Sequence, residues 1–151
     1  MRRLMWMCVS SDAGRTIVTT VFLLVTGSVL SQGDLRLELV LNKPEAGGLL
    51  RVALCPNKEA YDTEQGCRTM SVPAASRTVA CSFDKVEEGT YAVKVFHDIN
   101  SDGKLNTSWI GWPLEPYGFS NDAPVNAGPP SFRLAAVQVG EPRNPVRIRL
   151  R

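Results

Sequence analysis

The sequence predicts an all-β protein: a single antiparallel β-sandwich of about six to seven strands, with one long loop rich in glycine, proline and aromatic residues. Three observations support this fold class. Short apolar segments alternate with polar residues at the two-residue period of a half-buried strand. Turn-forming residues separate these segments. No window of eleven or more residues shows the periodicity of an amphipathic helix.

The first strand is expected at residues 34–42, where leucines recur at every second position from Leu35 to Leu41 and share one face. Pro44 and the glycine pair at 47–48 break this pattern. Five more strands are expected at residues 48–55, 77–83, 91–97, 131–139 and 145–151, with the long loop at 108–130.

Residues 1–31 have the composition of a secretory signal peptide. Arg2, Arg3 and Arg15 precede an apolar run at residues 17–30, which is shorter than the roughly 20 residues that a membrane-spanning helix needs. We expect cleavage near Ser31, which leaves a single domain of residues 32–151 in the periplasm or outside the cell. One alternative is an uncleaved signal anchor, and the leader would then be the part that contacts the membrane. The other is a start codon assigned too early.

The net positive charge of the chain belongs to this leader. Residues 1–31 contain three arginines and one aspartate, so the remainder has 14 basic and 14 acidic side chains. Nucleic-acid binding requires a clustered basic surface. The near-neutral domain therefore predicts no nucleic-acid partner.

Three cysteines lie beyond the leader, and an exported chain usually oxidises such residues in pairs. Cys55 and Cys67 flank a polar loop, and a disulfide between them would stabilise the fold by about 3 kcal/mol in the chain-entropy picture. Cys81 alternates with Phe83 on a predicted strand, so its thiol is expected to face inward. Pairing of Cys67 with Cys81 is the alternative.

A polar loop follows the strand at 91–97. Oxygen-bearing side chains recur at every second position from 98 to 102, and Gly103 follows them. This is the D-x-[DN]-x-[DN]-G pattern of calcium loops, because Ca²⁺ takes roughly six to eight oxygen ligands and glycine permits the sharp turn. The expected ligands are Asp98, Asn100, Asp102, the backbone carbonyl of Lys104, Asn106 and, from outside the loop, Glu115.

This loop is not an EF-hand. Trp109 stands at the twelfth position, where an EF-hand has a bidentate glutamate, and a strand rather than a helix precedes the loop. The last ligand would come from Glu115, Asn121 or Asp122, with an affinity in the roughly 10⁻⁴ to 10⁻³ M range of extracellular modules. The alternative is an Asx-rich turn whose side chains bond their own backbone. Zinc is less suited, since His97 is the only histidine.

The loop and the segment after it resemble an uncharacterised bacterial envelope family, domain of unknown function 2141. The matching blocks are HDINSDGKLNT at 97–107, GWPLEPYGFSN at 111–121 and PPSF at 129–132. The resemblance extends from about residue 35 to residue 150 and implies an exported single-domain β-sandwich without an assigned activity. Phe83 and the Gly89-Thr90-Tyr91 turn also resemble a crossing in transthyretin-like and carboxypeptidase-regulatory-like sandwiches.

The long loop carries four aromatic residues, Trp109, Trp112, Tyr117 and Phe119. We expect them to fold inward as a small core beneath the loop. The alternative is an exposed ligand-binding surface, on which the rings stack on sugars or pack on a protein, because aromatic rings supply large contact area.

Enzymatic interpretations have little support in the sequence. His97 and Asp98 are adjacent on a strand and therefore point to opposite faces. Ser120 lacks the Gly-x-Ser-x-Gly elbow of serine hydrolases. Asp98 and Glu115 are candidates for a glycosidase carboxylate pair, but nothing in the sequence fixes their separation.

The sequence thus predicts an exported, calcium-stabilised β-sandwich that serves as a binding or structural module of the cell envelope. Its partner would be an envelope protein or a glycan. A carbohydrate-binding module that uses the aromatic loop is the first alternative, and a small hydrolase that uses Asp98 and Glu115 is the second.

Overall fold

The computed structural model describes residues 32–126, 128–140 and 145–151. The expected signal peptide, residues 1–31, lies outside the described residues. Within them, no helix is long and apolar enough to cross a membrane.

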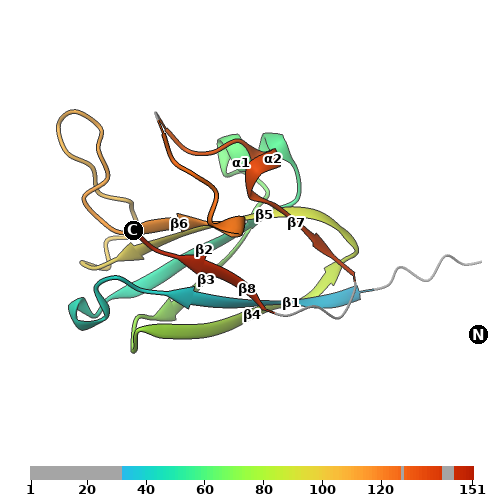
Figure 1. The fold of residues 1–151 in the computed structure, drawn as a ribbon, viewed down its shortest axis with the longest axis horizontal. Helices are drawn as coiled ribbons and strands as arrows, with labels where there is room; N and C mark the ends of the chain where they lie inside the picture. The colour runs from blue at the N-terminus through green and yellow to red at the C-terminus, as the bar shows by residue number, and fades with distance from the viewer. Residues whose placement is uncertain (1–31, 127, 141–144) are drawn as a thin grey trace, which may run out of the picture.

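The protein is an all-β sandwich of two sheets, as the sequence predicts (Figure 1). One sheet has the strand order β4-β1-β8, and the other has the order β3-β2-β5-β6, with β7 also paired to β5. The strands are β1 (Gln32–Val40), β2 (Leu49–Cys55), β3 (Arg68–Pro73), β4 (Thr78–Glu87), β5 (Gly89–Asp98), β6 (Tyr117–Phe119), β7 (Ala136–Val139) and β8 (Val146–Arg149).

Three details differ from the expected set of strands. β3 and β6 are additional, and both are difficult to recognise, since β3 has only two alternating apolar residues and β6 has three residues in all. The strand expected at 131–139 begins as a helical turn, α2 (Phe132–Ala135), and only β7 is extended. β8 pairs with β1 in parallel, although every other strand pair is antiparallel.

The main core lies between the two sheets. The alternating leucines of β1 are buried there, because the two-residue period directs all of them to the same face. They pack against alternating residues of the facing sheet. These are Leu50, Val52, Leu54, Val93 and Val95.

A second core covers the outer face of the five-stranded sheet. Two short helices lie there side by side, α1 (Lys58–Thr63) and α2 (Figure 1). The Asn57 side chain caps α1 by accepting a hydrogen bond from Ala60 N at 2.9 Å. Tyr61 from α1 and Phe119 from β6 are buried in this core. Two 3₁₀ turns complete the elements, η1 (Pro44–Ala46) and η2 (Ser120–Asp122).

A disulfide links the end of β2 to the segment after α1. It joins Cys55 to Cys67, and this pairing confirms the prediction. Cys81 is a free thiol of β4, partly buried against the main core, and this burial raises its pKa.

Candidate binding site: a polar loop that carries an aromatic hairpin

The site begins at the carboxyl end of β5, where His97 and Asp98 point to opposite faces of the sheet. His97 is fully buried, with Nε2 2.5 Å from the carbonyl oxygen of Gly47. Asp98 is also fully buried, but its carboxylate faces Arg51 of β2 on the other side. The two side chains therefore form no catalytic dyad, as strand geometry predicts.

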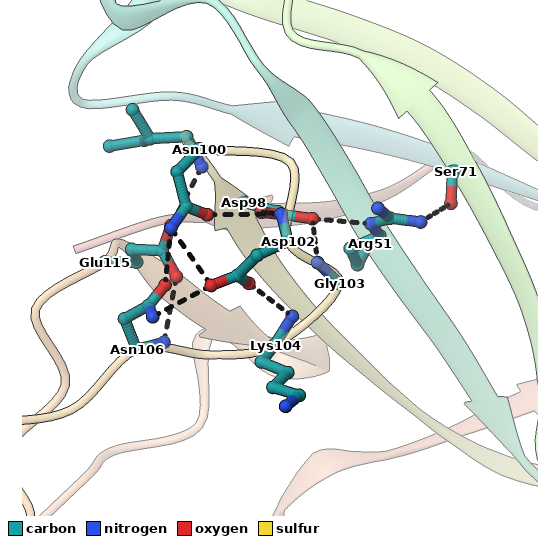
Figure 2. A network of polar contacts seen from close by, with 10 residues as sticks. Arg51, Ser71, Asp98, Asn100, Asp102, Gly103, Lys104, Asn106 and Glu115 are labelled. Atoms are coloured by element: carbon teal, nitrogen blue, oxygen red, sulfur yellow. Dashed lines mark hydrogen bonds and ion pairs between the residues drawn. The ribbon is translucent and has the colours of Figure 1, made fainter.

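Asp98 organises the start of the polar loop (Figure 2). Its Oδ2 accepts hydrogen bonds from Arg51 Nε at 2.8 Å and from Gly103 N at 3.0 Å, and its Oδ1 accepts one from Asp102 N at 3.0 Å. The Arg51 guanidinium also donates to Ser71 Oγ of β3 at 3.0 Å. The buried charge is thus paired and hydrogen-bonded, which is the condition for burying a carboxylate at acceptable cost.

The oxygen-bearing side chains of the loop converge on Asp102. Its Oδ2 accepts hydrogen bonds from Asn100 Nδ2 at 3.0 Å and from Asn106 Nδ2 at 3.1 Å, and its Oδ1 accepts one from Lys104 N at 2.8 Å. These bonds, the one from Asn106 foremost, lower the pKa of Asp102. Lys104 forms its hydrogen bond to Asp102 through the backbone, and its side chain extends away from the loop (Figure 2).

Glu115 closes the loop from the far side of the hairpin. This buried carboxylate accepts hydrogen bonds from Ile99 N on Oε1 and from Asn106 N on Oε2, each at 2.9 Å. The same side chain therefore ties together the two ends of the loop. The sequence identified Glu115 as a metal-ligand candidate, but it gave no sign of this clamp.

The predicted calcium ligands thus lie together. In the structure their oxygens accept hydrogen bonds from loop N–H groups, from amide side chains and from Arg51. Within the described ranges, no three His, Cys, Asp or Glu side chains form a group that could hold a metal ion. Calcium binding stays a prediction, and the Asx-rich turn describes the contacts observed.

A hairpin rises from this clamped base, and we call residues 105–114 the aromatic hairpin. Its two arms are joined by a bridge between Thr107 and Pro113 and by a bond from Leu114 N to Asn106 O at 2.8 Å. At the tip, Ser108 N donates to Trp112 O at 2.7 Å. Trp112 N in turn donates to Ser108 Oγ at 3.1 Å. The tip is therefore an ordered turn.

The aromatic hairpin presents its large apolar side chains to solvent. Trp109 is 96% exposed and Trp112 is 60% exposed, and Ile110 and Leu114 are exposed as well. The expectation that the aromatic residues fold inward is wrong for both tryptophans. It is correct for Phe119, which is buried in the second core, and Tyr117 packs against the same core. The hairpin holds the tryptophans outward because its own backbone bonds and the Glu115 clamp fix its conformation.

A groove of about 550 Å³ opens beside the hairpin. One wall is the hairpin itself, with Ile110 and Trp112, and the other includes Phe119 and Val125. Among the residues that the structure describes, no charged side chain lines the groove, and the polar side-chain groups there belong to Thr107, Asn126 and Tyr117 and to the indole N–H of Trp112. The groove could not be predicted from the sequence, because its second wall combines the short strand β6 with Val125 from a segment without regular structure.

Neither carboxylate of the hydrolase alternative lines the groove. Asp98 and Glu115 are both buried, and both oxygens of each accept hydrogen bonds. Ser120 is buried too, and its hydroxyl accepts a hydrogen bond from Val93 N at 2.8 Å. The roles visible for these three residues are structural.

The family model of an uncharacterized protein conserved in bacteria, DUF2141, matches residues 40–147. The chain belongs to the DUF2141 family. The match includes the polar loop, the aromatic hairpin and the groove, so these features lie within the DUF2141 region. The resemblance seen in the loop and hairpin motifs is thereby confirmed. No curated protein and no solved structure shows significant similarity to the chain.

Proposed function

We propose that this DUF2141 protein is an exported, non-catalytic binding module of the cell envelope, and that it takes an apolar ligand at the aromatic hairpin and the adjoining groove. The observation that carries the proposal is the exposure of Trp109 at 96% on a hairpin fixed by hydrogen bonds. Trp109 is exposed together with Ile110, Trp112 and Leu114 on the same hairpin, and contiguous apolar patches on a protein surface mark interaction sites.

The architecture supports binding rather than catalysis. The groove combines an apolar lining with a few polar groups, which is the usual character of a small-molecule site. The Glu115 clamp and the ion pair of Asp98 with Arg51 hold the base of the hairpin beside the groove before a ligand arrives. A preformed site reduces the entropy that binding must cost.

The chemistry of the groove favours an apolar ligand over a sugar. Exposed indoles suit stacking on pyranose rings, and this supports the carbohydrate alternative. However, a sugar also needs convergent donors and acceptors for its hydroxyl groups, and among the described residues the groove offers few polar side-chain groups, those of Thr107, Asn126 and Tyr117 and the indole N–H of Trp112. An aliphatic or aromatic ligand makes no such demand.

Titration with the neutral fluorescent probe N-phenyl-1-naphthylamine tests the proposal. We expect saturable binding that Ile110→Asp abolishes, because this change places a charge in the groove wall. Leu134→Asp is the matched control, since Leu134 is 47% exposed on α2 and does not line the groove. The apolar site is rejected if the wild-type protein does not bind the probe, or if the Ile110→Asp and Leu134→Asp variants bind it equally. Displacement of the probe by soluble oligosaccharides would favour the carbohydrate alternative.

Calcium binding at residues 98–106 is the second candidate. The convergence of Asn100, Asp102 and Asn106 around one point supports it, while Arg51 already neutralises the buried carboxylate of Asp98. At ten times its dissociation constant, calcium would add about 1.4 kcal/mol to stability. The melting temperature in 10 mM CaCl₂ should then exceed that in EDTA, and Asp102→Ser should remove the difference. Equal melting temperatures would reject this candidate.

Export is tested by cell fractionation and by mass spectrometry of the purified protein. We expect the protein in the periplasm or the medium, with an amino terminus near residue 32. A cytoplasmic protein that retains Met1 would contradict this part of the proposal.

A further inference from the structure

We propose that the aromatic hairpin inserts into the interfacial region of a lipid bilayer. This inference rests on the proposed function and names the class of its apolar ligand. The protein would dock peripherally, with the tip of the hairpin among the lipid headgroups and the sandwich in water.

The shape and the charge of the hairpin suit a bilayer surface. The hairpin projects beyond the two sheets at the end where β5 stops and β6 starts (Figure 1). Its ten residues, LNTSWIGWPL, contain no charged side chain. A convex, charge-free apolar tip fits a deformable bilayer, because no recessed partner surface is needed to cover it.

The backbone of the hairpin is partly hydrogen-bonded within the hairpin itself. Apolar surroundings penalise N–H and C=O groups that lack a partner. Within the hairpin, the N–H groups of residues 108, 111, 112 and 114 already donate to hairpin acceptors, and Pro113 has no N–H group. The tip therefore carries much of its backbone hydrogen bonding into the membrane interface, as an interfacial loop must.

The exposed side chains of the hairpin are of the kinds found at membrane–water interfaces. Trp109 and Trp112 each combine a large apolar ring with one N–H donor, which is why tryptophan is enriched at membrane–water interfaces. Ile110 and Leu114 add aliphatic surface beside them, at 57% and 61% exposure.

The base of the hairpin carries one exposed cation and one exposed anion, Lys104 and Asp102. Lys104 directly precedes the hairpin and is exposed, so its ammonium group is free to approach lipid phosphates. Asp98 and Glu115 are buried and hydrogen-bonded, which reduces their repulsion of those phosphates. Asp102 remains exposed at the base and opposes Lys104, so we expect only a modest preference for anionic lipid.

The test uses the full chain with Trp6→Phe, in which Trp109 and Trp112 are the only indoles. Fluorescence then reports on the hairpin alone, whatever the leader does. With phosphatidylcholine vesicles, and more so with added phosphatidylglycerol, we expect a blue shift of the emission and protection from acrylamide. Ile110→Asp in the same background should lower the affinity for vesicles roughly tenfold or more, while Leu134→Asp should not change it.

Vesicle binding without a spectral change, or equal binding by the two variants, would overturn the inference, because the leader or another surface would then be responsible. Absence of vesicle binding would overturn it as well. The proposed function would survive that result if N-phenyl-1-naphthylamine still bound in an Ile110-dependent way, and it would fail together with the inference if the probe did not bind. A blue shift caused by vesicle-free envelope proteins, with none caused by vesicles, would assign the hairpin to a protein partner and reject the membrane.

Discussion

Asp98→Ala should destabilise the protein severely, because it removes the acceptor at the base of the polar loop. The side chain of Asp98 is fully buried and accepts three hydrogen bonds, from Arg51 Nε at 2.8 Å and from the N–H groups of Asp102 and Gly103 at 3.0 Å each. Breaking a buried ion pair by removing one partner costs about 3–5 kcal/mol.

The lower end of this range applies here. The Arg51 side chain is 31% exposed and recovers water when its partner is lost, and the N–H donors lie on an exposed loop. We therefore expect a loss of about 3 kcal/mol in the free energy of unfolding. For a domain of ~120 residues this corresponds to a drop in melting temperature of about 12 °C.

The assay is thermal and urea unfolding followed by circular dichroism, in EDTA and in calcium. Asp84→Ala is the matched control, because that exposed carboxylate accepts, from the described residues, only a 3.1 Å bond from the Ser82 hydroxyl, and its loss should cost less than about 0.5 kcal/mol. A gap between wild type and Asp98→Ala that appears only in calcium would refute the reasoning, since Asp98 would then act chiefly through the ion. A stability difference between wild type and Asp98→Ala that is as large in EDTA as in calcium supports a role through hydrogen bonds.

Three further predictions concern stability. Gly48→Ala should lower the free energy of unfolding by roughly 2 kcal/mol more than Gly47→Ala does. Both glycines have positive φ, but a Cβ at position 48 would lie 2.4 Å from a backbone oxygen at the end of β5. Equal urea midpoints for the two variants would contradict this prediction. Replacing Cys55 and Cys67 together by serine should lower the free energy of unfolding by about 3 kcal/mol, and an unchanged midpoint would show that the disulfide adds nothing. The pKa of Asp102 is lowered on folding, so its contribution is present above the usual 3.8 and is lost as pH falls through the folded pKa. The melting-temperature gap between wild type and Asp102→Asn should therefore shrink toward acid pH, and a constant gap would contradict it.

The sequence predicted the structural features that depend on a local pattern of residues. The alternating leucines of β1 predict its buried face, and the spacing of Cys55 and Cys67 favours their pairing. It was less informative where two distant segments must meet. The pairing of Arg51 with Asp98 depends on the register of β2 against β5, which no local pattern encodes.

The orientation of the two tryptophans in the aromatic hairpin could not be predicted from the sequence either. Two tryptophans within four residues are as compatible with a buried cluster as with an exposed tip. The outcome depends on backbone bonds inside the hairpin and on the clamp by Glu115, which lies beyond its last residue. Motif spacing identified the family correctly, but it could not place the indole rings.

The central claim is that the unliganded protein holds Trp109 and Trp112 in water. Acrylamide quenching of the Trp6→Phe chain, without vesicles or probe, tests it most directly. The account predicts red-shifted emission and quenching close to that of N-acetyl-tryptophanamide, and Trp109 should be the more accessible ring when each tryptophan is replaced in turn by phenylalanine. Blue-shifted emission that acrylamide barely quenches would mean that the hairpin folds over its own groove, and it would contradict the account.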